Sequence, residues 1–254
     1  GVDYTHPDLG GCFGINCKVI GGYDFVNYDN DPMDDNGHGT HVAATAAGNG
    51  ILKGVAPDAK IVAYKVLDSG GSGYWSTIII SIDRSVDPNQ DGDFSDHLDV
   101  ISLSLGSYGD PDDPQSKAID NAVEAGVVAV VAAGNNGPAE GTIRSPGTAR
   151  KAITVGATDK QDVIASFSSR GPVTWSNGVI IKPDLVAPGV AICAARWDGA
   201  FSYANTRCNN DNNHVAISGT SMATPHVAGA AALIKQAHSD WMPDEVKMAL
   251  RNTA

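Results

Sequence analysis

The chain of 254 residues has no apolar run of roughly 20 residues, the length that a membrane-spanning helix needs. It is also poor in positive charge, with 17 Lys and Arg against 29 Asp and Glu and a net charge of −12. Because nucleic acids and anionic membranes attract clustered Lys and Arg, this deficit argues against both as partners. Repeats, low-complexity tracts and linkers are lacking too, so the sequence predicts a single domain over residues 1–254.

Cysteine is scarce, and its four positions form two locally close pairs. No Cys-x-x-Cys spacing occurs, which argues against a zinc site. Four cysteines allow three pairings. We favour Cys12–Cys17 and Cys193–Cys208, because each bridge would close a short loop between expected strands. The alternative is four reduced thiols in a cytosolic protein.

Strand-like apolar runs alternate with helical patterns along the chain. The helix expected at 114–125 has Pro114 in its first turn and Gly126 after it, and the run 127–133 is apolar without alternation, as in a strand buried on both faces. This alternation predicts an α/β fold: a three-layer, doubly wound, mostly parallel central sheet with helices on both faces. The strands are expected at 18–26, 60–67, 98–105, 127–133, 152–157 and 190–195, and the helices at 38–47, 74–86, 114–125, 227–237 and 243–251.

One serine stands where a nucleophile would be placed. Ser221 lies between a glycine-led turn and the helix expected at 227–237. A hydroxyl at a helix N-terminus meets unpaired backbone N–H groups and the positive end of the helix dipole, which together can stabilise an oxyanion. Taken alone, Ser221 is better explained as an N-cap residue.

Two further segments favour the catalytic interpretation. Residues 35–43 contain His38, a candidate general base, and residues 132–137 contain Asn135, a candidate amide donor. With these three segments the chain resembles the subtilisin-like serine peptidases, the subtilases, nearly from end to end. Supporting stretches in the family's order are 6–9, 54–57, 104–106, 167–172 and 182–189.

The resemblance implies a role for each residue of the site. Ser221 would attack a peptide carbonyl, His38 would take and return the proton, and Asn135 with the backbone N–H of Ser221 would hold the oxyanion. His41 completes a His-x-x-His pair with His38, but Gly39 stands where a zinc peptidase of that type needs its glutamate. We therefore expect His41, like His226, to be structural.

The family's catalytic aspartate would stand two residues before Gly1, so we expect this chain to be a piece that lacks the first strand and the C-terminal end. Without that carboxylate, His38 would lose its orienting partner, and catalysis by this piece alone is expected to be impaired. The parent protein is expected to be secreted and monomeric, to carry an N-terminal propeptide and to act on polypeptides.

Substrate binding in the family uses two exposed backbone segments that pair with an extended peptide. The matching segments here are Gly71, Ser72 and Gly73, and Ser104, Leu105 and Gly106. Residues 132–134, including Ala133 and Gly134, would line a roomy apolar first pocket, which predicts broad specificity with a preference for apolar or aromatic residues before the cleaved bond. The alternative for the glycines at 70–73 is a flexible loop.

An acidic stretch at 87–96 has oxygen ligands at alternate positions and a glycine at the sixth, like the first half of a calcium loop. Leu98 stands at the twelfth position, which rules out a full EF-hand. Either a shorter structural calcium site or a solvated acidic turn remains, and the chemistry itself needs no cofactor. The candidate ligands are Asp87, Asn89, Asp91, Asp93 and Asp96.

The alternative to a peptidase is a catalytically inactive peptide-binding module, which a subtilase-like fold without a working triad would be. An α/β-hydrolase is excluded, because Ser221 lacks the Gly-x-Ser-x-Gly elbow and His38 precedes it in the chain.

Overall fold

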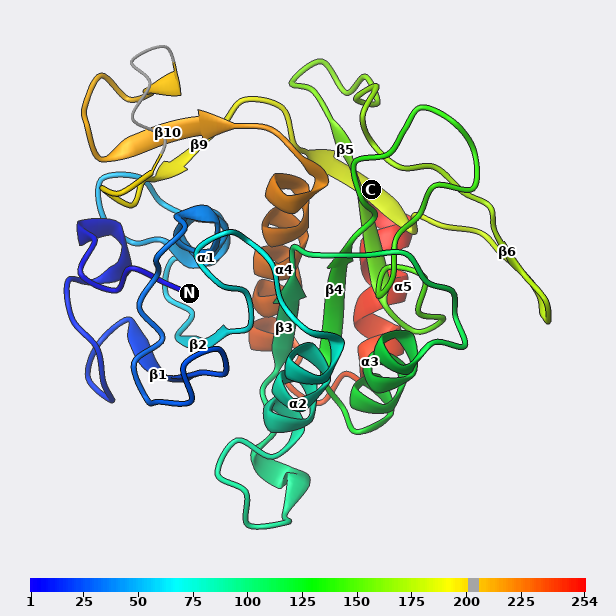
Figure 1. The fold of residues 1–254 in the computed structure, drawn as a ribbon, viewed down its shortest axis with the longest axis horizontal. Coiled ribbons are helices and arrows are strands. Elements are labelled where there is room, and N and C mark those ends of the chain that lie inside the picture. Colours follow the sequence, from blue (N-terminus) through cyan, green and yellow to red (C-terminus); the bar gives the residue numbers. More distant parts are fainter. Residues whose placement is uncertain (201–205) are drawn as a thin grey trace. The chain divides into compact units, whose positions relative to one another are not determined.

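The computed structural model describes residues 1–200 and 206–254 and divides them into two compact units (Figure 1). The first unit consists of Gly1–Ser81 and Ala191–Ile217, and the second of Ile82–Val190 and Ser218–Ala254. Helix α2 (Trp75–Val86) contains the boundary between the segment Gly1–Ser81 and the segment Ile82–Val190.

A four-stranded parallel sheet forms the centre of the second unit, with the strand order β3-β4-β5-β8. Its strands are β3 (Val100–Leu103), β4 (Val128–Ala132), β5 (Ile153–Thr158) and β8 (Leu185–Pro188). Every residue of β4 and β5 is buried, which explains why β4 is apolar without alternation. The predicted α/β class with a mostly parallel central sheet is confirmed.

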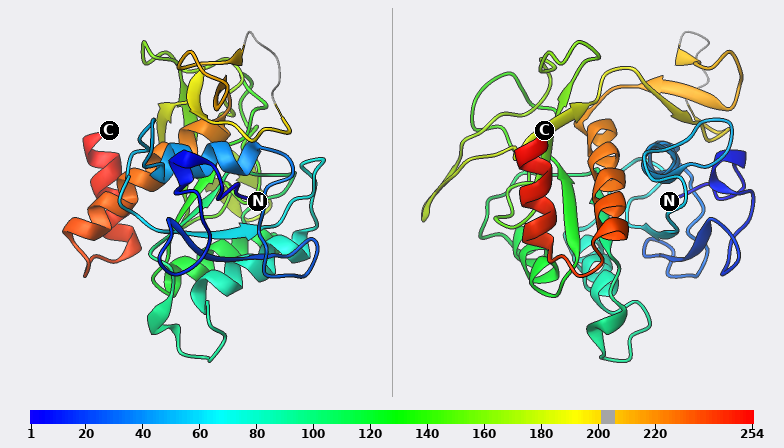
Figure 2. Two further views of the ribbon diagram at one scale, coloured as in Figure 1. Left: turned by 90° about the vertical axis from the view of Figure 1, so that its left-hand side faces the viewer. Right: turned by 180° about the vertical axis from the view of Figure 1, so that it is seen from behind.

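Helices cover both faces of this sheet. Helix α3 (Pro114–Glu124) lies on one face, and α4 (Thr220–Ala237) and α5 (Pro243–Thr253) lie on the other (Figure 2). Small side chains on α4 let the helix approach β4 and β5 closely, because they leave little bulk between helix and sheet. The core there contains Val130, Val155, Ala223, Val227, Ala228 and Ala231. This packing fixes the first turn of α4 beside the sheet.

The first unit contains a parallel strand pair, β1 (Val19–Asp24) and β2 (Ile61–Lys65), and an antiparallel pair, β9 (Ile192–Ala195) and β10 (His214–Ile217). Helix α1 (His38–Ala47) packs against β9, and the short helix η1 (Pro7–Leu9) lies against α1. The core of this unit contains Leu9, Val19, Ala44, Ala63 and Ala195.

The prediction for one helix was wrong at its start. Helix α4 begins at Thr220, not at 227, and therefore contains both Ser221 and Pro225. A proline inside a helix normally leaves a carbonyl without its donor, so the sequence favoured a later start. Four short strands and two short helices were not foreseen: β6 (Val173–Trp175), β7 (Gly178–Ile180), β8, β10, η1 and η2 (Phe94–Asp96).

Both predicted disulfides are confirmed, and both lie in the first unit. The Cα atoms are 5.6 Å apart in Cys12–Cys17 and 6.0 Å apart in Cys193–Cys208. Within residues 1–200 and 206–254, no helix is both long and apolar enough to cross a membrane.

Candidate active site

Ser221 lies in the first turn of α4, directly after the N-cap Gly219 and Thr220. The carbonyl of Gly219 accepts hydrogen bonds from the N–H groups of Met222 at 3.0 Å and Ala223 at 3.4 Å. The backbone N–H of Ser221 has no acceptor among the described residues. That N–H is therefore a free donor at the positive end of the helix dipole, next to a half-buried hydroxyl.

Ser104 holds the nucleophile's main chain. Because Pro225 has no N–H, it cannot donate to the carbonyl of Ser221 four residues earlier. The Oγ of Ser104, just after β3, donates to that carbonyl at 2.8 Å instead. In the opposite direction, the Ser221 Oγ lies 3.4 Å from the carbonyl oxygen of Ser104. Ser104 was predicted only as a substrate-binding residue, and the structure adds this second contact.

Asn135, which follows β4, is oriented by Thr220. The Oδ1 of Asn135 accepts from the Thr220 N–H at 2.9 Å and from its Oγ1 at 3.0 Å. The orientation of the amide follows from the Thr220 N–H, which can only donate and therefore requires an oxygen opposite it. Its Nδ2 has no acceptor in the part of the chain that the structure describes. The second unit thus presents two free donors with the Ser221 hydroxyl, and Thr220 is a contributor that sequence reasoning missed.

His38 is the first residue of α1, after the N-cap Gly37. Asp34, three residues before the N-cap, caps this helix with its side chain: its carboxylate accepts hydrogen bonds from the N–H groups of Gly37 at 3.0 Å and Thr40 at 2.9 Å. Burial lowers the pKa of the His38 imidazole below its ordinary value, and the charge of Asp34 opposes that shift. The neutral imidazole, which a general base requires, is therefore favoured. Asp34 was not foreseen, although an aspartate shortly before a glycine-led helix is a signal for such a cap.

The other two histidines of the motifs have structural contacts. His41 is buried, and its Nε2 lies 3.0 Å from the carbonyl oxygen of Ile192 and 3.2 Å from that of Val215, which ties α1 to β9 and β10. The Nδ1 of His226 lies 2.8 Å from the carbonyl oxygen of Met222 on the preceding turn.

Of the two predicted substrate-binding segments, the one in the second unit has its main chain open. Among the residues described, neither Leu105 nor Gly106 has a main-chain hydrogen bond. An extended peptide could therefore add alongside this segment. Ala133, part of the predicted first pocket, is fully buried, and Gly134 has a φ of 103°.

The segment in the first unit is an exposed turn. Asp68 closes it, since its N–H donates to the carbonyl of Ser72 at 2.8 Å and its carbonyl accepts from Gly71 at 2.9 Å. The side chain of Asn36 reaches the carbonyl of Ser69 at 3.0 Å. This contact joins the turn that includes Gly71 and Ser72 to the residues just before His38.

The acidic loop at 87–96 uses its carboxylates on its own backbone. Asp87 accepts from the N–H groups of Asp91 at 3.2 Å and Gly92 at 3.0 Å, and Asp93 accepts from Ser95 at 2.9 Å. In the described part of the chain, no group of three or more His, Cys, Asp or Glu side chains is placed to hold a metal ion. A calcium site in this loop stays a prediction.

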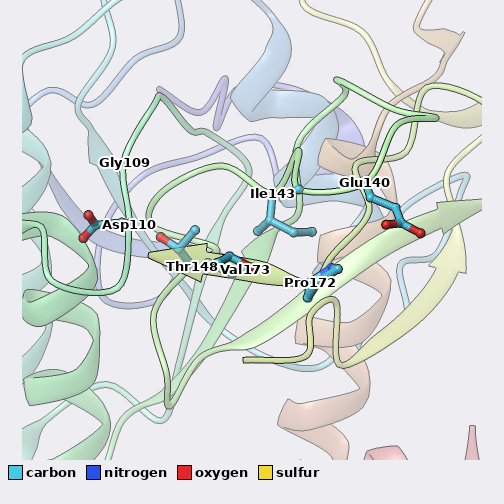
Figure 3. A pocket seen from close by; sticks show the side chains of 9 residues that line it. Gly109, Asp110, Glu140, Ile143, Thr148, Pro172 and Val173 are labelled. Carbon is cyan, nitrogen blue, oxygen red and sulfur yellow. The ribbon is translucent and has the colours of Figure 1, made fainter. Parts of the chain in front are cut away.

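A cavity of about 310 Å³ lies elsewhere in the second unit (Figure 3). Its lining includes Ile143, Thr148 and Val173, with the carboxylates of Asp110 and Glu140 toward opposite ends. Neither Ser221 nor Asn135 contributes to it, so this cavity is not the place where the proposed nucleophile would act.

Comparison with known proteins gives a consistent result. The model of the subtilase family matches residues 1–254, and the chain belongs to this family. It is 41% identical over 267 residues to the serine protease AprX of Bacillus subtilis, covering 98% of this chain and 58% of that protein. It is 32% identical over 404 residues to the minor extracellular protease Vpr of the same organism, covering 100% of this chain and 47% of that protein. The chain thus spans about half the length of these relatives.

A solved structure resembles the fold. The crystal structure of a cold adapted subtilisin-like serine proteinase superposes with a TM-score of 0.79 at 35% sequence identity, covering 99% of this chain and 78% of that one. The resemblance seen in the sequence motifs is therefore confirmed for both the family and the fold.

Proposed function

We propose that this chain carries the catalytic residues of a secreted serine endopeptidase that cleaves polypeptides through an acyl-enzyme. The observation that carries the proposal is the pair of free donors, the Ser221 N–H and the Asn135 Nδ2, presented with the Ser221 hydroxyl at the start of α4. Membership of the subtilase family, with relatives named as serine proteases, supports it.

In this mechanism the Ser221 Oγ attacks the carbonyl carbon of the scissile bond while His38 takes the hydroxyl proton. The two free donors stabilise the oxyanion of the tetrahedral intermediate. When the intermediate collapses, His38 gives its proton to the leaving amine, and an ester to Ser221 remains. Water activated by His38 then hydrolyses that ester and restores the serine.

The carboxylate that orients His38 is proposed to precede Gly1. Asp34 is committed to capping α1, and Asp35 forms an ion pair with Lys65 at 2.7 Å, so neither is available for this role. Gly1 itself lies against the first turn of α1, since a Cβ on Gly39 would stand 2.0 Å from the carbonyl oxygen of Gly1. A residue shortly before Gly1 would thus approach His38.

Further features of the parent protein belong to the same proposal. Substrate would pair in extended form with the segments at 71–73 and 104–106, and the apolar wall at 132–134 would favour apolar or aromatic side chains. Secretion is supported by the two disulfides and by the relative named as an extracellular protease. A single domain over 1–254, a monomeric state, an N-terminal propeptide and a structural calcium ion at 87–96 complete the proposal.

A fluorophosphonate probe tests the activated nucleophile. The full-length, processed protein would be labelled and the modified peptide mapped, with Ser221→Ala and His38→Ala as controls. Labelling at Ser221 that is lost in both variants is expected. A folded and processed protein that remains unlabelled would refute the peptidase, and the inactive peptide-binding module would then account better for the open segment at 104–106.

A further inference from the structure

We propose that Arg144 adds selectivity for a carboxylate to the pocket for the residue before the scissile bond, so that glutamate is preferred to glutamine alongside the apolar and aromatic residues proposed above. The inference rests on the peptidase function proposed above, in which the segment 104–106 pairs with the substrate and the segment 132–134 lines that pocket. It concerns the second unit alone.

The stem of Arg144 lies between these two segments. Its backbone N–H donates to the carbonyl of Ala133 at 3.0 Å. A Cβ built on Gly106 would stand 3.1 Å from the Arg144 Cβ, and one built on Gly134 would stand 2.7 Å from its Cγ. Glycine at both positions leaves room for the arginine stem, and a larger residue at either would collide with it.

The guanidinium is held at two points. Its Nε donates to the Oδ1 of Asn136 at 2.7 Å, one residue after the proposed oxyanion donor. Its Cζ lies 3.7 Å from the ring centroid of Tyr108, which is 79% exposed. The group is therefore fixed by one hydrogen bond and one cation–π contact, so little conformational freedom is left to lose when a ligand binds.

The charge of Arg144 has no counter-ion among the described residues. Among the residues that the structure describes, no carboxylate lies within 4.0 Å of its nitrogens, and its two Nη atoms make no hydrogen bond. Arg150 and Arg196, by contrast, pair with Asp112 at 2.7 Å and Asp198 at 3.0 Å. Arg144 is therefore a half-buried cation whose terminal nitrogens could bind a carboxylate.

Glutamate is a suitable carboxylate for this position. Its methylene groups can lie along Gly134, which is half-buried, and its planar carboxylate matches the terminal nitrogens of a guanidinium. Glutamine has the same shape without the charge, so a pair of peptides that differ only by glutamate or glutamine isolates the contribution of Arg144. A charge-assisted contact worth about 1.4 kcal/mol corresponds to about a tenfold preference.

The test uses the full-length, processed protein and peptides that carry Glu, Gln or Leu before one scissile bond. We expect kcat/KM to be about tenfold higher for Glu than for Gln, and the ratio to fall as salt rises, since salt screens partly exposed charges. Arg144→Gln should bring the ratio to about one. Arg251→Gln removes the same charge from an exposed position on α5 and should leave the ratio unchanged.

The possible failures are distinguishable. Equal cleavage of the Glu and Gln peptides by a protein that cleaves the Leu peptide would overturn the selectivity and leave the peptidase function intact. A preference for Glu that survives in Arg144→Gln would assign it to another cation and equally refute the proposal. No cleavage of any peptide, together with no fluorophosphonate labelling of Ser221, would refute the peptidase function and the selectivity with it.

Discussion

The hydrogen bond from Ser104 to the carbonyl of Ser221 makes a sharp prediction about the nucleophile's support. Ser104→Ala removes the 2.8 Å bond, and because Pro225 offers no N–H, the carbonyl is then left without a donor. Pro225→Ala should restore the ordinary helical donor to the same carbonyl. The two substitutions together are therefore expected to cost less than the sum of their separate effects.

The structure sets the size of the effect. A buried acceptor that loses its donor costs about 1–3 kcal/mol. Since Ser221 is only half-buried, water can reach part of this site, and we expect a loss of about 1–2 kcal/mol in the free energy of unfolding for Ser104→Ala. In a Pro225→Ala background the same change should cost less than about 0.5 kcal/mol, which gives a coupling energy of about 1 kcal/mol.

Urea unfolding measures this cycle. All four proteins would carry Ser221→Ala, which prevents self-digestion and keeps the carbonyl in question. Ser107→Ala is a matched control, because the Ser107 Oγ contacts only the carbonyl of Tyr108, at 3.4 Å, and it should show no coupling to Pro225→Ala. Additive costs for Ser104→Ala and Pro225→Ala, within about 0.3 kcal/mol, would refute the idea that the serine replaces the missing helical donor.

Three further predictions concern the second unit. Thr220→Val removes the Oγ1 donor to Asn135 and should lower kcat about fivefold with little change in KM. Thr220→Ser keeps that donor and should retain activity. Equal losses of activity in both variants would contradict the role of Thr220 in positioning Asn135. Burial alone would raise the pKa of Asp184, but the charges of Lys182 and Lys247 outweigh it and hold that pKa below 3.8. Asp184→Asn should therefore reduce the free energy of unfolding, measured with urea, by about 3 kcal/mol at pH 7. The difference in this free energy between wild type and variant should shrink as the pH falls below 3.8. A difference that stays constant with pH would be inconsistent with the ion pair. If the loop at 87–96 binds calcium, calcium at about 100 times its Kd should stabilise the protein by about 2.7 kcal/mol. Asp87→Asn should abolish this stabilisation, and Asp29→Asn should not. An unchanged Tm of the wild type on addition of calcium would show that the loop is a solvated turn.

Much of the fold could be predicted, because its signals are local. Helix α1 begins at His38, directly after the glycine that marks its N-cap, and α3 begins at the predicted Pro114. The apolar run that contains β4 identified a strand buried on both faces. The start of α4 was missed, because Pro225 indicates a helix boundary locally while the bond that makes this proline tolerable comes from Ser104, 117 residues away from Ser221 in sequence.

The same distinction holds for the candidate site. Ser221, His38 and Asn135 could be identified from short motifs, since each stands in a characteristic run of neighbours. The contacts that orient them could not. Thr220 reaches Asn135 across 85 residues, and the two glycines that flank the Arg144 stem belong to separate segments. Such contacts are set by the packing of β3, β4 and α4, which no local pattern encodes.

The division of the chain into units has a consequence for its synthesis. Each unit is assembled from two separate segments, and the first is complete only once residue 217 has been made. The nucleophile, Ser221, is synthesised later still, on helix α4, which packs against the sheet of β3, β4 and β5. A nascent chain that has emerged only as far as β10 carries His38 and Asn135 but no Ser221, so it could not cut its neighbours or itself. The order of the sequence thus delays the proposed proteolytic capacity until almost all of this chain has been translated.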